Sequence, residues 1–452
     1  MYSATTIGRT KRHLNISNAG PRFGSTKLAA GAPHIRAFCE CAGACAIRGA
    51  LTLAVLSALL LIAARPAQAQ TEGAVGSKAR KPSETVLYNF YYGSDGAYPI
   101  SRLTSDGAGN FYGTTCSYEG QGPGYGTVFE LSPNGSGGWN ETVLYSFTGG
   151  ADGSNPMYSD VIFDSVGNLY GTTEFGGANG YGVVFELSPA GTSWTETVLH
   201  SFAWTDGANP LTGVIMDPAG NLYGTTGYGG ANGYGTVFEM SPSGGGWTEQ
   251  VIYTLVYSSY TAGLTMDAAG NIFGVSLSTV FELSPNGSGG WNATVIQTFC
   301  SRLKDGCFAV GTPALDQAGN LYGMTADGGA KNYGTAYKLT PGENGKWTEK
   351  ILHSFRSGKD GSHPWAGVVL DAAGNIYGTT LYGDEDDGGI VFELVAPVGT
   401  GKPYEEKILW SFTDMDGYWP HSSLILDSSG KLYGTTVFGG SNGVGVVFEV
   451  TP

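Results

Sequence analysis

One short sequence recurs along the chain and constrains the fold more than any other feature. The stretch GNLYGTTEFGGANGYGVVFELSP (167–189) is nearly repeated by GNLYGTTGYGGANGYGTVFEMSP (220–242). Its core of Gly, Asn, an apolar residue, an aromatic residue and Gly starts at Gly109, Gly167, Gly220, Gly270, Gly319, Gly374 and Gly430, with Lys in place of Asn in the last copy. A period of about 50 residues indicates a solenoid or a propeller.

Each repeat contains signals for four short strands. In the second repeat these are residues 156–164, 168–173, 182–188 and 195–202. Gly, Pro, Asn and Ser bound them, which is typical of an antiparallel meander, and no stretch has sustained helical periodicity. Seven such units predict an all-β fold, a seven-bladed β-propeller of four-stranded blades.

The order of strands predicts how the ring closes. The repeat region begins with a strand of the fourth type (84–90) and ends with one of the third type (445–452). The last repeat therefore lacks a fourth strand, which the N-terminal strand can supply. Because this pairing removes an open sheet edge, we assign residues 84–452 to a propeller closed by residues 84–90.

The recurring residues are expected to be structural, because chemistry needs an asymmetric site. Asp164, followed by Gly167 and Asn168, is expected to cap amides in the turn between the first two strands. Leu169 is expected in the core. Tryptophans that precede the fourth strand should pack between blades: Trp139, Trp194, Trp247, Trp291 and Trp347.

The N-terminal region has the composition of an export signal. Residues 50–64 are uncharged and apolar, Arg48 precedes them, and Ala67-Gln68-Ala69 follows. A spanning helix needs about 20 apolar residues, so we predict a signal peptide (1–69) cleaved after Ala69 and a linker (70–83). The alternative is a membrane tether by an uncleaved anchor at 50–64. The stretch before residue 50 is long, so the true start codon stays open.

Charge excludes one class of partner. The chain has 23 Lys and Arg against 38 Asp and Glu, a net charge of −15, and its first 70 residues contain a single acid, Glu40. The rest is therefore more acidic still, which disfavours nucleic acid. We expect no stable membrane insertion after signal cleavage, a monomer, and an extracellular glycan or protein as partner.

Three cysteines lie in the repeat region. An oxidising compartment permits a disulfide between Cys300 and Cys307, although the sequence does not decide whether it forms. Cys116 would then remain as a small buried residue.

The units DxxGNLYGTTxxGGxxGYGTVFELSP and WTETVLYSFxxxDGxxP resemble the GloVer tandem repeat, an extracytoplasmic bacterial family of unknown function. The resemblance covers about residues 84–452 and implies export and the repeat fold, without any activity or site residue. The strand order is also similar to NHL-type propellers. Members often end in a sorting anchor, which we do not expect here because the chain stops at Pro452.

Binding is expected on one face. Antiparallel order places the loops between the fourth and first strands, which carry Asp-Gly, on the same face as the Gly-rich loops between the second and third strands. Loops on a rigid scaffold are common binding sites, and their aromatic side chains suit sugar faces. The candidates are Tyr181, Tyr234, Tyr333, Trp204, Trp365 and Trp419. The alternative is that these rings only pack over the next blade.

Two features break the symmetry. The fourth repeat lacks both elaborate loops, in 256–263 and 275–281, which predicts a notch. The sixth repeat carries Asp384, Asp386 and Asp387, which could hold Ca²⁺, an oxygen-seeking ion; the alternative is a solvated acidic loop. We expect no other cofactor.

The sequence predicts a secreted binding scaffold for an extracellular ligand, with a glycan as the leading class. A cell-surface structural or protein-interaction module is the alternative, and a propeller lyase or hydrolase comes third. No nucleophile elbow, zinc-ligand spacing or phosphate loop is present. His200 and His353 replace Tyr in fourth strands and are expected to be packed, whereas His363 and His421 lie on or beside the elaborate face.

Overall fold

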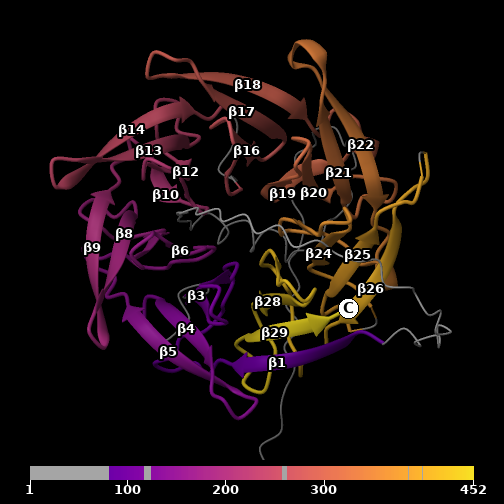
Figure 1. Cartoon of the computed structure of the whole chain (residues 1–452), viewed down its shortest axis with the longest axis horizontal. Coiled ribbons are helices and arrows are strands. Elements are labelled where there is room, and N and C mark those ends of the chain that lie inside the picture. The colour runs from indigo at the N-terminus through magenta and orange to yellow at the C-terminus, as the bar shows by residue number, and fades with distance from the viewer. Residues whose placement is uncertain (1–80, 117–123, 257–261, 385, 400) are drawn as a thin grey trace, which may run out of the picture.

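The computed structural model describes residues 81–452 except 117–123, 257–261, 385 and 400. The expected signal peptide and most of the linker therefore lie outside the described residues. Seven antiparallel sheets surround a central axis (Figure 1), which confirms the predicted all-β, seven-bladed propeller. Within the described ranges, no helix is long and apolar enough to span a membrane.

In blades 1 to 6 the strands run from the axis outward in chain order, whereas in blade 7 the first strand of the chain is the outermost (Figure 1). Blade 1 contains β2 (Thr104–Ser105), β3 (Phe111–Thr115), β4 (Thr127–Pro133) and β5 (Trp139–Ser146). Blade 2 contains β6 (Ile162–Phe163), β7 (Leu169–Thr173), β8 (Val183–Ala190) and β9 (Ser193–Ser201). Blade 3 contains β11 (Ile215–Met216), β12 (Leu222–Tyr228), β13 (Thr236–Ser243) and β14 (Gly246–Thr254), and β10 (Ala208–Pro210) pairs with β12. Blade 4 contains β15 (Thr265–Met266), β16 (Ile272–Ser276), β17 (Thr279–Pro285) and β18 (Trp291–Thr298).

The remaining blades follow the same plan. Blade 5 contains β19 (Cys307–Leu315), β20 (Leu321–Asp327), β21 (Thr335–Pro341) and β22 (Trp347–Ser354). Blade 6 contains β23 (Val369–Leu370), β24 (Ile376–Thr380), β25 (Ile390–Val395) and β26 (Glu405–Ser411). Blade 7 contains β27 (Ile425–Leu426), β28 (Leu432–Thr436), β29 (Val446–Thr451) and β1 (Ser83–Asn89). Short 3₁₀ turns occur at η1 (Leu303–Asp305), η2 (Glu343–Gly345) and η3 (Gly358–Asp360).

The ring closes as predicted, through strand β1. It pairs antiparallel with β29, with Glu84 opposite Val450 and Asn89 opposite Val446. The side-chain oxygen of Asn89 also accepts a hydrogen bond from the Ser441 amide at 2.8 Å. The first and last described strands therefore belong to one sheet, and β1 covers the edge of β29 that would otherwise be open.

The innermost strand has two residues in every blade except blade 5, where β19 has nine. In blade 2 the expected strand 156–164 is reduced to β6, and the residues before it lie along the axis instead. There the Ser159 hydroxyl accepts the Thr172 amide at 3.4 Å, in place of a backbone partner. The same bond runs from Thr114 to Ser101 and from Thr435 to Ser422, each at 3.0 Å.

The turn between the first two strands is held by an aspartate, as predicted. Oδ1 of Asp164 accepts the amides of Val166 and Asn168 at 2.9 Å. Its Oδ2 accepts the Asn168 side chain at 2.9 Å and the Tyr170 hydroxyl at 3.1 Å. The repeated Asp, Asn and Tyr therefore form a structural cap.

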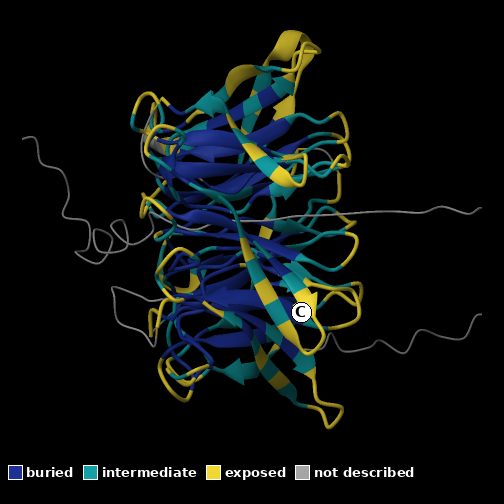
Figure 2. Cartoon of the chain, turned by 90° about the vertical axis from the view of Figure 1, so that its left-hand side faces the viewer, coloured by how far each residue is buried: buried dark blue, intermediate teal, exposed yellow. Residues whose placement is uncertain are grey.

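Neighbouring blades pack through the recurring aromatic residues. Trp247 of blade 3 lies 6.2 Å from Tyr170 of blade 2, and Trp291 of blade 4 lies 5.6 Å from Tyr223 of blade 3, between ring centroids. These contacts confirm the predicted packing between blades. Buried residues run through the middle of every sheet, and exposed ones concentrate in the loops and outer strands (Figure 2).

Loops of neighbouring blades are linked on the elaborate face. The backbone amide of Asn209, in the Asp-Gly loop that enters blade 3, donates to the Tyr181 carbonyl of blade 2 at 2.9 Å. Beside it, Gly182 has φ of 92°, and a Cβ there would lie 2.7 Å from Cδ of Pro210. Glycine is therefore required where one blade meets the proline of the next.

Blade 4 lacks the Gly-rich loop, as its sequence indicated. Only Leu277 and Ser278 separate β16 from β17, while residues 257–261 of the neighbouring loop lie outside the described residues. Next to this short turn, Cys300 and Cys307 form a disulfide. Cys116 is buried, with its sulfur 3.3 Å from the Tyr98 carbonyl oxygen.

Candidate binding site at the propeller axis

A pocket lies on the axis, where the segments that lead into the innermost strands of all seven blades converge. Its empty volume is about 700 Å³, part of which is open to solvent. The part of it that a water-sized sphere can occupy is about 100 Å³. Every blade contributes an equivalent segment, so the differences between repeats decide the chemistry of the pocket.

These differences make the pocket asymmetric. Blades 3, 4 and 5 contribute small groups at the wall, including Gly213, Gly263 and Gly311. The other blades contribute aromatic, charged and hydroxyl side chains, which are Trp365, His421, Ser423, Arg102, Tyr158 and Asp160. One wall therefore consists of small, aliphatic and threonine residues, and the opposite wall carries the aromatic and charged side chains.

Tyr158 reaches the pocket because blade 2 contains one extra residue. Its segment 156–164 is one residue longer than the equivalent 210–217 of blade 3. Tyr158 has φ of 53°, a left-handed conformation that is uncommon for a bulky residue. Its hydroxyl lies 3.1 Å from Nε2 of His421 in blade 7. Such strain often accompanies a functional site.

His421 lies between two other aromatic rings. It is 4% exposed, and its ring centroid is 5.0 Å from that of Tyr158 and 5.8 Å from that of Trp365. Burial lowers the pKa of His421 to about 3. The imidazole is therefore neutral at neutral pH, and the three rings form an uncharged aromatic wall.

Asp160 and Arg102 supply charge beside this wall. Oδ1 of Asp160 accepts the Arg102 backbone amide at 2.9 Å, which joins blades 2 and 1. Burial raises the pKa of Asp160 to about 6, and the Arg102 charge opposes that rise. The carboxylate is therefore ionised at neutral pH, close to a cationic side chain. This arrangement offers hydrogen-bond acceptors and donors to a polar, neutral ligand.

Of the six aromatic residues predicted to bind a ligand, Trp365 is the one that lines the pocket. Trp419 packs instead against Tyr382 and Phe438, with ring centroids 5.7 and 5.4 Å away. The other four lie on the loops of the elaborate face. Tyr181 and Trp204 are edge to face at 5.8 Å, Tyr234 is 49% exposed, and Tyr333 packs on His363 at 5.7 Å.

The acidic loop of blade 6 gives no clear metal geometry. Asp384 is half-buried and its amide donates to the Gly358 carbonyl at 2.9 Å, whereas Asp386 and Asp387 are exposed. Residue 385 between them lies outside the described residues. The groups of three ligand atoms within 4.8 Å of one another lie elsewhere in the described part of the chain. Calcium binding by this loop stays a prediction.

A second set of polar groups follows the outer rim of the ring. At six blade boundaries, the Asp of an Asp-Gly loop faces a Glu on the outer strand of the next blade; we call these the rim carboxyl pairs. They are Asp95 with Glu141, Asp152 with Glu196, Asp206 with Glu249, Asp305 with Glu349, Asp360 with Glu406, and Asp416 with Glu84. Each Asp increases the rise in pKa that burial gives its Glu.

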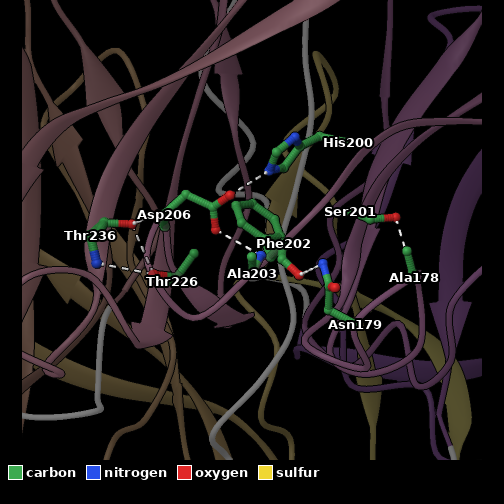
Figure 3. Close-up of polar contacts among 9 residues, drawn as sticks. All are labelled: Ala178, Asn179, His200, Ser201, Phe202, Ala203, Asp206, Thr226 and Thr236. Atoms are coloured by element: carbon green, nitrogen blue, oxygen red, sulfur yellow. Dashed lines mark hydrogen bonds and ion pairs between the residues drawn. The ribbon is translucent and has the colours of Figure 1, made fainter.

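A side chain of the preceding outer strand usually completes the pair. The hydroxyls of Tyr88 and Tyr145 each lie 3.2 Å from their aspartates, and Nε1 of Trp410 donates to Asp416 at 3.0 Å. His200 stands at this position before Asp206, with Nε2 3.2 Å from Oδ2 (Figure 3). The two histidines expected only to be packed, His200 and His353, therefore contact acidic residues.

Sequence reasoning missed the axial residues Tyr158, Asp160 and Arg102, and did not connect His421 with them. The sequence did contain a signal for them. Blades 3 and 4 carry Gly213 and Gly263 at the positions where blades 1 and 2 carry the charged residues Arg102 and Asp160. The extra residue in blade 2 was visible as a longer spacing. The rim pairs were harder to find, because the Glu belongs to the next repeat.

Comparison with known proteins identifies the repeat. The model of the Gloeobacter/Verrucomicrobia repeat family matches residues 118–309 and 309–452. No protein with curated annotation has a matching sequence.

Solved propellers share the fold at low sequence identity. The chain is similar to a catalytically inactive histidine-to-alanine variant of virginiamycin B lyase from Staphylococcus aureus with quinupristin: the TM-score is 0.51 and the identity 14%, over 82% of this chain and 99% of that one. A protein from Lactobacillus plantarum has a TM-score of 0.48 and 12% identity, over 72% and 88%. PorZ, a surface component of the type-IX secretion system of Porphyromonas gingivalis, has a TM-score of 0.46 and 15% identity, over 77% and 45%.

Proposed function

Because the chain belongs to the Gloeobacter/Verrucomicrobia repeat family and folds as a closed propeller, we propose that it is an exported binding protein whose axial pocket takes a neutral, hydroxyl-rich ligand, with a glycan as the leading class. The observation that carries the proposal is the asymmetric wall formed by Trp365, His421 and Tyr158. A repeat protein needs no such asymmetry for folding.

The chemistry of the wall favours a carbohydrate. Sugar rings have apolar faces that stack on aromatic side chains, and hydroxyls that need donors and acceptors. His421 is neutral and so does not attract an anion. Asp160 and Arg102 can exchange hydrogen bonds with hydroxyls from the side.

The repeats themselves offer matched substitutions for a test. Blade 3 carries Leu211 where blade 6 carries Trp365, and blade 1 carries Ile100 where blade 7 carries His421. Trp365→Leu and His421→Ile therefore introduce residues that this fold already holds at those places. We expect glycan-array binding by the wild-type chain and at least tenfold weaker binding by each variant, measured by calorimetry with the best glycan.

Trp204→Ala serves as the control, because Trp204 is 46% exposed on the loop face and does not line the pocket. It should leave affinity unchanged. If Trp204→Ala removed binding while Trp365→Leu did not, the ligand would lie on the loops and the axial site would be rejected. Binding of a surface protein without any glycan would favour an interaction module.

A lyase or hydrolase is the second candidate, favoured by the contact between the Tyr158 hydroxyl and His421 Nε2. The neutral imidazole of His421 can accept a hydrogen bond from the Tyr158 hydroxyl, and the similar virginiamycin B lyase is inactive as a histidine-to-alanine variant. The test is incubation of the bound glycan with the chain, followed by mass spectrometry. Cleavage by the wild type, and no cleavage by His421→Ile at glycan concentrations that saturate the variant, would identify an enzyme. An intact glycan after incubation with the wild type would identify a binding protein.

Export forms part of the proposal. The apolar segment 50–64 with its small-residue cleavage motif supports it, and so does the disulfide between Cys300 and Cys307, because disulfides persist in oxidising compartments. Expression with the full N-terminus should release a chain that begins at Gln70, as read by N-terminal sequencing. Recovery of the chain in the membrane fraction with residues 50–64 attached would indicate a tether instead.

A further inference from the structure

Two of the rim carboxyl pairs differ from the others in the residue that completes them. At most boundaries this residue is Tyr, Trp or Gln, which donates a hydrogen bond to a carboxylate. Before Asp206 and Asp360 it is His200 and His353. A neutral histidine differs from Tyr, Trp and Gln because its ring nitrogen can coordinate a metal ion.

The cluster of His353, Asp360 and Glu406 has the spacing of a metal centre. Nε2 of His353 lies 3.3 Å from Oδ1 of Asp360 and 3.6 Å from Oε1 of Glu406. Ligands bound tetrahedrally at about 2.0–2.2 Å lie roughly 3.4 Å from one another. Two of the three separations in the cluster are close to this value, and the ligand atoms all lie within 4.8 Å of one another.

The polar side-chain atoms of this cluster are buried and form few hydrogen bonds with one another. The side chains of His353, Asp360 and Glu406 are 11%, 19% and 12% exposed. His353 Nε2, Asp360 Oδ2 and Glu406 Oε1 each lack a well-formed hydrogen bond. Burial of such groups is unfavourable unless something pairs them. A divalent cation would pair the His353 nitrogen and the Glu406 oxygen, with Asp360 as the third ligand.

The second cluster repeats the arrangement between blades 2 and 3. Nε2 of His200 lies 3.2 Å from Oδ2 of Asp206, whose other oxygen is held by the Ala203 amide at 2.8 Å (Figure 3). Glu249 offers the third ligand, and the ligand atoms lie within 4.8 Å of one another. Its Oε1 is also buried without a hydrogen bond. The same three elements supply the same three ligand types twice in one ring.

We propose that His353, Asp360 and Glu406 bind one Zn²⁺ ion, and that His200, Asp206 and Glu249 bind a second. One imidazole nitrogen and two carboxylate oxygens are ligands that Zn²⁺ binds in a four-coordinate site. Ca²⁺ instead prefers six or more oxygen ligands. Each ion links a loop at the end of one blade to the outer strand of the next. The two ions therefore clamp two of the blade boundaries from outside.

The test is calorimetric titration of the metal-stripped chain with Zn²⁺, and with Ca²⁺ separately. We expect two Zn²⁺ per chain and no comparable binding of Ca²⁺. His353→Tyr and His200→Tyr should each remove one ion, and the double variant both. Tyr is the residue that the ring carries at Tyr88 and Tyr145, so these variants should match the wild type in melting temperature in EDTA.

A gain of binding makes the test stricter. Tyr145 occupies the position beside Asp152 and Glu196 that His353 occupies beside Asp360 and Glu406. Tyr145→His should therefore raise the stoichiometry from two to three, and Co²⁺ should give tetrahedral absorption bands that grow in proportion. Unchanged stoichiometry in the histidine-to-tyrosine variants would assign the ions to the acidic surface and overturn the proposal, as would equal binding of Ca²⁺.

Discussion

The hydroxyl of Tyr158 in blade 2 lies 3.1 Å from Nε2 of His421 in blade 7, across the segment that blade 1 contributes to the axis. The two residues are 263 positions apart in sequence. The contact depends on the extra residue in blade 2 and on the left-handed backbone conformation of Tyr158. Two non-adjacent blades are thus joined at the place where the repeats differ most.

Tyr158→Gly should separate stability from binding. Glycine adopts φ of 53° without strain, and relief of about 1–3 kcal/mol offsets the lost ring contacts. We expect a free energy of unfolding within about 1 kcal/mol of wild type, and loss of glycan binding. Urea unfolding and calorimetry measure the two quantities. Loss of stability without loss of binding would make Tyr158 a packing residue.

Tyr158→Phe is the matched comparison. It keeps the ring and the backbone strain but removes the hydroxyl that faces His421. Because Nε2 loses this contact, we expect a loss of about 0.5–1.5 kcal/mol in the free energy of unfolding. An unchanged free energy of unfolding would mean that the contact between the Tyr158 hydroxyl and His421 does not stabilise the fold.

The architecture could be predicted from the sequence because every repeat carries the same signals. Seven copies of the turn around Asp164 and its equivalents fixed the blade number, and the strand types at the two ends of the repeat region fixed the closure. The innermost strand was predicted too long because Ser159 and its equivalents look like strand residues. In the structure their hydroxyls replace the backbone partner of the next strand.

The candidate sites combine residues from different repeats, so the sequence of one repeat does not show which residues meet. The loop aromatics were visible in the sequence, yet only Trp365 enters the pocket, because the axis is reached by the segment after the loop. Similarly, His353 and Glu406 stand in successive repeats. Their approach to 3.6 Å depends on how neighbouring blades pack.

Removal of residues 81–89 should open the ring. Strand β1 supplies the outer strand of blade 7, and its loss exposes the edge of β29. We expect a melting temperature at least 10 °C lower and concentration-dependent association, seen by calorimetry and light scattering. A control that removes only 70–80 should melt like wild type. Equal melting of both deletions would show that β1 does not close the ring.

Leu169→Ala tests the core between blades. Leu169 is fully buried in β7, so the substitution should lower the free energy of unfolding by about 2–5 kcal/mol. Val166→Ala in the adjoining turn should change it by less than about 0.5 kcal/mol, because Val166 is 77% exposed. Urea unfolding at equilibrium gives both values. Similar values for the two variants would contradict the described packing.

The rim carboxyl pairs should make the propeller less stable at alkaline pH. Burial, with the Asp416 charge adding to it, raises the pKa of Glu84 to about 8 from an ordinary value of 4.5. The folded chain therefore holds a proton that the unfolded chain has lost. Stability is full below pH 4.5, falls as pH rises through this window, and reaches its lower level above pH 8.

Glu84→Gln removes this titration from the closing strand. We expect the variant to exceed the wild type in free energy of unfolding by on the order of 1–2 kcal/mol at about pH 9, with the difference shrinking toward about pH 5. Glu405→Gln, at an exposed position of β26, should follow the wild type at both values. Thermal melts across this pH range measure the effect. If the Glu84→Gln variant lost stability as steeply as the wild type, Glu84 would already be ionised in the folded ring.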